Sequence, residues 1–423
     1  MNVLLIGSGG REHAIAWKLR QSNRLRKLII APGNAGTRQH GDNVQLDISD
    51  FDAVAEVILR EAINLVVVGP EVPLVEGIKD DLHQRPELND LLIVGPSAAA
   101  AQLEGSKAFA KAFMQDYRIP TAGYREFSAA NRSEGEDYLR QLTPPIVLKA
   151  DGLAAGKGVL ICEDVETAVV EFGRMLDGSF GTASARVIVE DFLEGIEFSV
   201  FVLTDGRDYK ILPVAKDYKR IGEGDTGLNT GGMGSVSPVP FVTPQLMQKV
   251  EDRIIQPTIK GIRERNLDYR GVIFFGLIRV DSDPYVIEYN CRFGDPETQS
   301  VLMRLDNDLL DLFERTARGT LSEVKIQESE QAAATVVLVS GGYPGAYEKG
   351  KRIRGLPAVR DSVVFHAGTR LNPADEVITN GGRVLALTSL GTTLTQALAK
   401  SNRNAELIEY DGKNYRRDIG LDV

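Results

Sequence analysis

The first hundred residues carry four short, almost wholly apolar runs, and each of them ends in glycine or proline. The runs are "VLLIG" (3–7), "KLIIAPG" (27–33), "LVVVGPE" (65–71) and "LLIVGPS" (91–97). Apolar runs of this kind indicate strands buried on both faces, and their alternation with helical stretches indicates an open parallel sheet. We therefore predict an α/β unit over residues 1–103. Ligands of such sheets bind beyond the carboxyl ends of the strands, which is where "GSGG", "PGNAG" and "GPEVPL" fall.

The glycines of the first turn resemble part of a dinucleotide-binding fingerprint. Gly7 and Gly9 fit that pattern, but Glu12 stands where it needs its third glycine. The second strand also ends without the Asp or Glu that would bind a ribose hydroxyl. The sequence thus argues against NAD or FAD. A glycine turn before a helix is still a good phosphate site, because free N–H groups and the helix dipole favour an anion.

Composition excludes several classes of function. The chain has 423 residues, enough for two to four domains, and its 49 basic and 59 acidic residues give a net charge of −10. Nucleic acid is therefore not the expected partner, since backbone binding needs a basic face. The two cysteines, Cys162 and Cys291, cannot form a disulfide framework, and we expect buried thiols. No apolar run approaches the length of a membrane span and no leader pattern opens the chain, so we expect a cytoplasmic protein.

The stretch "DGLAAGKGV" (151–159) resembles a phosphate-binding loop but does not match the Walker pattern GxxxxGK[S/T]. Only three residues separate Gly152 from Gly156, and Lys157 is followed by Gly158 rather than by a hydroxyl residue. The loop follows an apolar strand that ends at Lys149, where an unpaired charge would be costly. Two readings stay open at this point: a flap over phosphates, or a plain glycine-rich hairpin.

In the rest of the middle region we predict strands that carry acidic side chains. One strand runs into Glu190 and a second opens at Glu197. A hairpin over 271–290 places Glu288 and Asn290 on one face, because alternate residues of a strand point the same way. The glycine-rich stretch 221–238 is too polar for a core, and we predict a mobile loop there.

These motifs, in this order, resemble the phosphoribosylamine–glycine ligase family of the ATP-grasp superfamily. The resemblance rests on "IGSGGREHA", "PGNAG", "GPE.PL", "KADGLAAGKGV", "EDFLEGIEFS", "AKDYKRIGEGDTGLNTGGMG", "EYNCRFGDPETQ" and "FHAGT". It implies an α/β and α+β multidomain protein with an N-terminal open parallel α/β sheet, a central ATP-grasp fold and a small C-terminal α/β domain. The implied ranges are 1–103, 104–325 with a lid at about 121–195, and 326–423.

The resemblance also implies an activity. It is the ATP-dependent joining of glycine to 5-phosphoribosylamine, through glycyl phosphate, to give glycinamide ribonucleotide, ADP and phosphate in purine biosynthesis. The runner-up is another carboxylate–amine ligase of purine metabolism. An oxidoreductase and a non-catalytic nucleotide-binding module are the alternatives from other classes. The implied cofactors are ATP and Mg²⁺ or Mn²⁺. We expect small-molecule partners only, no nucleic acid or membrane, and a monomer in transient contact with the enzyme that supplies phosphoribosylamine.

Site residues are carried over position by position. The implied metal ligands are Glu288 and Asn290, and the implied catalytic residues are Arg292, Asp217 and Lys157. Arg292 and Asp217 would hold the carboxylate and the ammonium of glycine. The residues expected at the sugar amine are Gly9, Gly10, Asn34 and Glu71. Those expected at ATP are Lys107, Lys149, Gly152, Gly156, Lys157, Gly158, Glu190, Asp191, Phe192, Leu193 and Glu197.

One departure and two weaker features complete the prediction. The strand "VIFFGLIRV" has no carboxylate before Asp281, whereas many ATP-grasp enzymes have a metal ligand there, so Glu297 becomes a candidate helper. The four histidines (His13, His40, His83 and His366) are scattered without zinc spacing, and we predict structural roles for them. We predict that "SGGYPG" (340–345) connects elements rather than binding phosphate.

Overall fold

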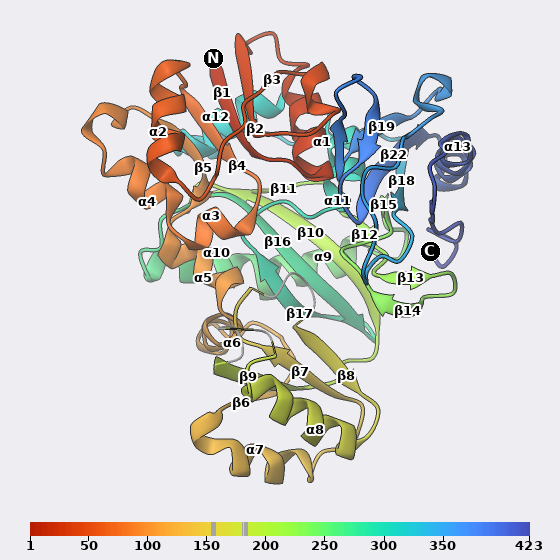
Figure 1. The fold of residues 1–423 in the computed structure, drawn as a ribbon. Helices are drawn as coiled ribbons and strands as arrows, with labels where there is room; N and C mark the ends of the chain where they lie inside the picture. Colours follow the sequence, from red (N-terminus) through yellow and green to blue (C-terminus); the bar gives the residue numbers. More distant parts are fainter. Residues whose placement is uncertain (154–157, 180, 182–184) are drawn as a thin grey trace.

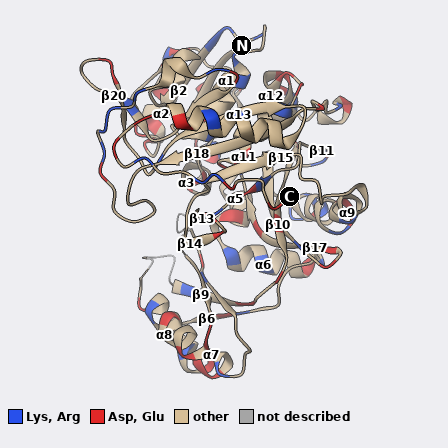
Figure 2. Cartoon of the chain, turned by 90° about the vertical axis from the view of Figure 1, so that its right-hand side faces the viewer, with Lys and Arg blue, Asp and Glu red and all other residues tan. Residues whose placement is uncertain are grey.

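The computed structural model describes residues 1–153, 158–179, 181 and 185–423. Most of the chain forms one broad body, and a smaller unit lies apart from it in both views (Figure 1 and Figure 2). Many of the longer helices begin at an Asp, Ser or Thr whose side chain accepts an N–H of the first turn, as in α6 (Lys107–Asp116) after Ser106. Within the described residues, no helix is long and apolar enough to cross a membrane.

The N-terminal sheet is parallel, as the four apolar runs predicted, and a short fifth strand, β3, gives it the spatial order β3-β2-β1-β4-β5. Neighbouring residues of β1 pack into different clusters, Val3 and Leu5 into one and Leu4 and Ile6 into the other, so both faces of the sheet are buried. The strands are β1 (Asn2–Gly7), β2 (Lys27–Pro32), β3 (Asp42–Asn43), β4 (Leu65–Val68) and β5 (Leu92–Pro96). The helices are α1 (Gly10–Leu19), α2 (Phe51–Arg60), α3 (Glu71–Val75), α4 (Ile78–His83) and α5 (Ala98–Gly105), with 3-10 turns at Thr37–Gln39 and Pro86–Leu88.

The central strands continue this sheet, which the sequence did not predict. The start of β16 pairs antiparallel with the end of β5, Tyr269 with Pro96 and Arg270 with Gly95. Further along, β16 pairs with β10 and β17, so nine strands form one sheet. The added strands are β10 (Ile196–Thr204), β11 (Tyr209–Ile211), β16 (Tyr269–Val280) and β17 (Asp283–Asn290). The helices of this part are α6, α9 (Pro244–Val250), a π-helical stretch (Glu251–Ile255) and α10 (Gln256–Glu264).

The separate unit is an antiparallel sheet in the order β6-β9-β7-β8. It has its own apolar cluster, in which Phe127, Leu148 and Phe172 are buried. Figure 1 shows this unit at the foot of the molecule, with α7 and α8 on its outer side. Its elements are β6 (Tyr124–Ser128), α7 (Arg132–Leu139) after a 3-10 turn (Ala129–Asn131), β7 (Ile146–Ala150), β8 (Val159–Cys162), α8 (Val165–Leu176) and β9 (Arg186–Asp191).

The C-terminal sheet takes strands from two distant parts of the chain. Its order is β12-β15-β18-β22-β19, and β12 and β15 come from residues 216–237. The strands are β12 (Lys216–Asp217), β15 (Gly234–Ser237), β18 (Ala332–Val339), β19 (Val363–His366) and β22 (Arg383–Gly391). Around them lie α11 (Glu297–Arg304), α13 (Leu394–Leu407), the hairpins β13 (Arg220–Gly222) with β14 (Thr226–Asn229) and β20 (Thr369–Leu371) with β21 (Val377–Thr379), and a 3-10 turn at Leu356–Ala358. By contrast, α12 (Leu309–Arg318) packs against β5 and β16 and is followed by a 3-10 turn at Leu321–Glu323.

The glycine-rich stretch 221–238 is not the mobile polar loop that we predicted. It forms the β13–β14 hairpin and then enters β15; Met233, just before that strand, and Val236 within it are fully buried. Polarity does not exclude this strand from the core because its hydroxyls are paired. The Ser235 hydroxyl donates to the Pro296 carbonyl (2.8 Å), and the Ser237 hydroxyl donates to the Val214 carbonyl (2.7 Å).

Candidate active site

The candidate metal ligands lie together on β17, as the sequence predicted. The Asn290 amide nitrogen is 3.4 Å from Glu288 Oε1. Glu288 stands opposite Gly276 of β16, where an added Cβ would lie 3.1 Å from Glu288 Cγ, so the glycine leaves room for the carboxylate. In the part of the chain that the structure describes, no group of three His, Cys, Asp or Glu side chains could hold a metal. One carboxylate and one amide oxygen suit Mg²⁺ shared with phosphate oxygens better than a site closed by protein ligands.

A buried cluster of positive charge lies at the base of the four-stranded unit. Lys149 Nζ is 2.8 Å from Glu190 Oε2, and Lys111 Nζ is 3.2 Å from Glu190 Oε1. All three side chains are buried. Burial lowers the pKa of Lys111 to about 8. The single Glu190 carboxylate thus pairs with two ammonium groups and leaves one positive charge without a partner among the three. This charge favours an anionic ligand such as phosphate.

Lys107 links this region to the start of the glycine loop. Its Nζ donates to the Gly152 carbonyl (2.9 Å), and Asp151 caps α6 by accepting from the Ala108 N–H (3.1 Å). Burial lowers the pKa of Lys107, against the attraction of the Glu288 carboxylate. Gly152 has a φ of +113°, which suits glycine. The loop therefore begins in a turn tied to the expected phosphate site.

The remaining loop residues are only partly described. The Gly158 carbonyl accepts from the Ala150 N–H (2.8 Å) where the chain enters β8. Gly156 and Lys157, expected at the phosphates, lie outside the described residues.

The predicted adenine hinge joins β9 to β10. The Asp191 N–H donates to the Gly123 carbonyl (3.0 Å), which holds the end of β9 beside the start of β6. Phe192 follows with 39% of its surface exposed, an unusual exposure for a phenylalanine, and Leu193 is partly buried beside it. An aromatic face left open beside buried polar groups is the kind of surface that a planar base can cover.

A second charged cluster joins Glu197 to Asp217. Lys219 Nζ lies 2.5 Å from Glu197 Oε2 and 3.1 Å from Asp217 Oδ1. Burial opposes the charge of Lys219, but the Asp217 and Glu197 carboxylates hold its pKa well above its usual value. Burial and the Asp217 charge raise the pKa of Glu297 to about 7, and the Ser199 hydroxyl donates to Glu297 Oε1 (3.2 Å). Two carboxylates expected at ribose and at glycine are thus bridged by a lysine that we did not predict.

Arg292 is held from several sides within the protein. Its guanidinium pairs with Glu71 (3.3 Å) and Glu104 (2.8 Å) and donates to Asn290 Oδ1 (3.1 Å). Burial opposes its charge, yet the Glu104 and Glu71 carboxylates keep the pKa of Arg292 above its usual value. The arginine thus connects Glu71, at the N-terminal sheet, to the candidate metal ligands on β17.

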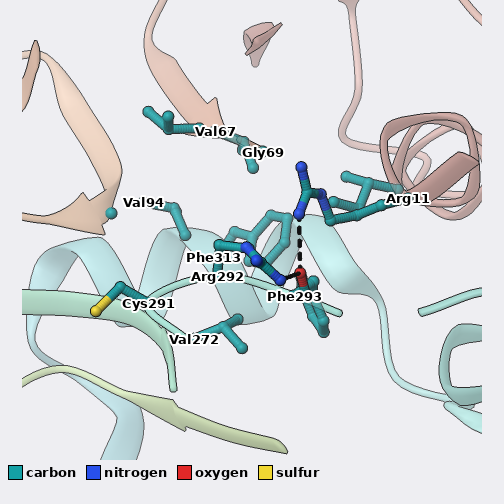
Figure 3. Close-up of a pocket in the computed structure, with 12 residues that line it drawn as sticks. Arg11, Val67, Gly69, Val94, Val272, Cys291, Arg292, Phe293 and Phe313 are labelled. Atoms are coloured by element: carbon teal, nitrogen blue, oxygen red, sulfur yellow. Dashed lines mark hydrogen bonds between the residues drawn. The ribbon is translucent and has the colours of Figure 1, made fainter. Parts of the chain in front are cut away.

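Figure 3 shows the guanidinium groups of Arg11 and Arg292 meeting at one carbonyl. Both donate to Phe293 O, at 3.1 Å and 3.2 Å. The cavity beside them has a volume of about 10 Å³, room for roughly one water molecule. It is therefore an internal packing gap between β4, β5 and β16, and too small for a substrate.

The turn before α1 is built differently from our prediction. The Gly9 N–H, expected to face a phosphate, donates to Glu12 Oε2 (2.6 Å). The Asp295 carboxylate approaches the Arg11 N–H (3.4 Å) at the same helix end. Gly10 faces α11, since a Cβ there would lie 2.6 Å from Gln299 Nε2. The carboxylates of Glu12 and Asp295 thus already accept from N–H groups at the start of α1, where the helix dipole is positive. The turn can therefore bind the hydroxyl or amine groups of a ligand as well as a phosphate.

Asn34 is also engaged within the protein. Its amide nitrogen donates to the carbonyls of Ser8 and His366 (both 2.8 Å), and its oxygen accepts from the N–H groups of Gly36 and Thr37. The amide that we expected to face ribose hydroxyls therefore fixes the turn that precedes α1.

Three histidines that we described as scattered lie together. His13 Nε2 is 3.2 Å from His40 Nε2, and the His366 N–H donates to His13 Nδ1 (2.7 Å). Residues far apart in sequence meet here because α1, the loop after β2 and β19 converge. Burial lowers the pKa of His13 well below its usual value and that of His366 to about 4. The imidazoles of His13 and His366 are therefore neutral at pH 7, and the cluster connects the N-terminal and C-terminal parts of the chain in this state.

Stability should consequently fall as the pH drops. A histidine whose folded pKa is depressed favours the unfolded state once the pH passes below its unfolded value near 6.5. His366 alone should cost about 2 kcal/mol of unfolding free energy between pH 7 and pH 5. Urea unfolding of the wild type and of His366→Asn at both pH values measures this, and the variant should lose less. The control His83→Asn, at an exposed histidine, should follow the wild type. Equal losses in the wild type and His366→Asn would contradict the prediction.

Family models match nearly the whole chain in succession. They are the phosphoribosylglycinamide synthetase N domain over residues 1–104, its ATP-grasp (A) domain over 105–298 and its C domain over 333–422. The phosphoribosylamine–glycine ligase of Agrobacterium fabrum is 48% identical over 421 residues, 99% of this chain and 98% of the relative. That of Nostoc sp. is 46% identical and covers 100% of both chains. This chain belongs to the phosphoribosylamine–glycine ligase family.

Solved structures agree with the assignment to this ligase family. A phosphoribosylamine–glycine ligase from Thermotoga maritima matches with a TM-score of 0.84 at 34% identity, over 99% of this chain and 100% of that chain. A biotin carboxylase from Campylobacter jejuni, solved as a beta-gamma-ATP complex, matches with a TM-score of 0.74 at 14% identity, over 100% of this chain and 94% of that one. At that identity the second match shows the fold alone.

The sequence analysis missed several residues that the structure places in the candidate site. Lys111 stands four residues after Lys107, so both lie on one face of α6, and that spacing was a signal. Lys219 stands two residues after Asp217, a weaker signal. Glu104 and Asp295 reach the site only through the packing of helices against the sheet, which no local pattern reveals.

Proposed function

We propose that this chain joins glycine to 5-phosphoribosylamine at the expense of ATP. The products are glycinamide ribonucleotide, ADP and phosphate, as a step of purine biosynthesis. One observation carries the proposal: the buried pair of lysines on Glu190 meets the strand that carries Glu288 and Asn290, because Lys149 Nζ also donates to the Ile287 carbonyl (3.3 Å). Together they provide the cations and oxygen ligands that phosphoryl transfer needs, without a covalent nucleophile.

In this proposal ATP binds between the four-stranded unit and the central sheet. Lys107 and Lys149 contact its phosphates, and the hinge from Glu190 to Leu193 holds adenine. Glu197 accepts from the ribose hydroxyls, for which its carboxylate is well suited because Lys219 keeps its pKa low. Glu288 and Asn290 would hold Mg²⁺, or Mn²⁺, which when bound would withdraw charge from the phosphate oxygens.

The first step forms glycyl phosphate. A carboxylate oxygen of glycine attacks the γ-phosphorus, and the bond from that phosphorus to the bridging oxygen of ADP breaks. Asp217 holds the glycine ammonium beside Lys219. Arg292 holds either the glycine carboxylate or the phosphoryl group, because its planar fork is already fixed by Glu71 and Glu104.

The second step forms the amide. The amine of phosphoribosylamine attacks the carbonyl carbon of glycyl phosphate, the bond from carbon to the phosphate oxygen breaks, and the nitrogen loses a proton. The sugar amine binds at the turn before α1, near Gly9 and Gly10, with Glu71 on the side of Arg292. Asn34 shapes this turn through Ser8. We also propose a cytoplasmic monomer in transient contact with the enzyme that supplies phosphoribosylamine.

The test of the function is the dependence of ADP release on both substrates. With ATP, Mg²⁺ and glycine, ADP should form rapidly only when freshly made phosphoribosylamine is added, and glycinamide ribonucleotide should appear with it. Omitting glycine is the matched control. ADP release that depends on another carboxylate, or on bicarbonate, would identify a different ligase or carboxylase.

A further inference from the structure

One arginine of the C-terminal sheet reaches out of that sheet to the junction between the two substrate regions. Arg383 begins β22. Its guanidinium donates to the carbonyls of Gly231 and Asp295 and pairs with the Asp295 carboxylate (3.3 Å). Its side chain is mostly buried, and the Arg383 and Arg11 charges overcome the effect of burial to keep the pKa of Asp295 below its usual value.

The hydrogen bond from Arg383 to Gly231 connects the arginine to the part of the site proposed to bind glycine. The Gly231 N–H donates to the Tyr343 hydroxyl (2.9 Å), so the C-terminal part holds this turn at both backbone groups. The neighbouring Thr230 donates through its N–H and its hydroxyl to the Lys219 carbonyl (2.8 and 2.7 Å). Lys219 bridges Glu197 and Asp217. Moving Gly231 would therefore move the lysine that positions both carboxylates.

The contacts of Arg383 with Asp295 connect the arginine to the turn proposed to bind the sugar amine. Asp295 accepts from Gln299 Nε2 (2.8 Å) and from the Arg11 N–H (3.4 Å). Gln299 in turn contacts Gly10, and it is almost fully buried. These two connections also meet, since an added Cβ on Gly232 would lie 2.3 Å from Pro296 Cδ. The glycine turn therefore packs directly against the residue after Asp295.

We propose that Arg383 is a positioning residue that couples the two steps of the reaction. It fixes the position of the glycine-binding part of the site relative to the part that binds the sugar amine. Glycyl phosphate then forms where the amine can attack it. This inference rests on the proposed function and assigns part of it to the C-terminal domain. It also gives the "SGGYPG" segment a role, because that segment carries Tyr343.

Such a residue would control how completely the acyl phosphate made in the first step is used by the amine in the second step. An acyl phosphate that is not met by the amine reacts with water instead, so a small misalignment wastes ATP. Geometry of this kind is sensitive, because a shift of about 1 Å can cost about a hundredfold in rate. A residue that only stabilised the fold would lower activity without changing how many ADP molecules are released for each product.

The experiment measures ADP and glycinamide ribonucleotide in the same reaction, with ATP, glycine and freshly made phosphoribosylamine. The wild type should give a ratio near one. Arg383→Ala should raise the ratio about tenfold, by the sensitivity of such alignment. Arg383→Lys should fall between them, because Nη1 of the arginine donates to both carbonyls while Nη2 pairs with the Asp295 carboxylate, and a single ammonium nitrogen cannot take both positions. Tyr343→Phe should raise the ratio by less.

The control is Arg352→Ala, which removes an exposed arginine of the same domain that pairs with Glu376. It should keep a ratio near one. Thermal unfolding checks each variant, and if Arg383→Ala does not fold, Arg383→Lys and Tyr343→Phe decide. A ratio near one in the folded Arg383 and Tyr343 variants would overturn the inference alone. A wild type that forms no product would overturn the proposed function and this inference with it.

Discussion

Replacing Glu288 with glutamine should lower the rate of ATP-dependent product formation by about a thousandfold, since losing a charged metal ligand costs several kcal/mol of transition-state stabilisation. Glutamine keeps the shape of the side chain, and its amide can still contact Asn290. The carboxylate is only partly buried and makes no ion pair in the described structure, so the fold should survive. Steady-state rates over a range of Mg²⁺ concentrations measure the effect.

The matched control lies at the other end of the same strand. Asp283→Asn removes a carboxylate that pairs with Lys249 and Arg253 near the surface, and it should leave the rate close to that of the wild type. Thermal shifts separate the metal from the nucleotide. In the wild type MgATP should stabilise more than ATP alone, and in Glu288→Gln this difference should shrink. Full activity of Glu288→Gln at saturating Mg²⁺ would remove Glu288 from the site.

The N-terminal sheet could be predicted because its signal is local. Every residue from Val3 to Ile6 is apolar, and a strand buried on both faces requires that pattern wherever it lies in the fold. The junction with β16 could not be predicted in this way. It depends on the backbones of Gly95 and Gly271 approaching closely, and two glycines carry no hydrophobic pattern. The polar β15 was misread for a similar reason, since the partners that bury Ser235 lie some sixty residues away.

In the candidate site, too, the sequence predicted features that depend on local pattern and missed those that depend on distant hydrogen-bond partners. Strand alternation predicted that Glu288 and Asn290 share one face, and the structure places them side by side. Their role as metal ligands came from the family resemblance and stays a prediction. The predictions for Gly9 and Asn34 assumed that their polar groups were free, and the structure gives those groups to Glu12 and Ser8. A sequence motif identifies which residues gather at a site. It does not show which hydrogen bonds the protein has already used to build that site.

Gly10→Val should lower kcat/KM for phosphoribosylamine by about a hundredfold, as a displacement of about 1 Å at a reacting group would. The reason is contact rather than backbone strain. The positive φ of this turn lies at Gly7 (+126°), whereas an added Cβ at Gly10 would lie 2.6 Å from Gln299 Nε2 and 3.4 Å from Asp295 Oδ1. Gln299 is buried and donates to Asp295 Oδ1 (2.8 Å), so a valine that displaces Gln299 also disturbs Asp295. KM for ATP should change little, because the predicted nucleotide contacts belong to the central strands and the four-stranded unit.

A second substitution tests this reason directly. Gln299→Ala removes the side chain that valine would strike, so the double variant Gly10→Val with Gln299→Ala should bind phosphoribosylamine better than Gly10→Val alone. Two unrelated defects would add instead, and the double variant would be worse than either single variant. Initial rates against phosphoribosylamine and against ATP, with thermal unfolding of each variant, give the comparison. If Gly10→Val abolished ATP binding and spared the sugar amine, the N-terminal sheet would be the nucleotide site and the proposed arrangement of substrates would be wrong.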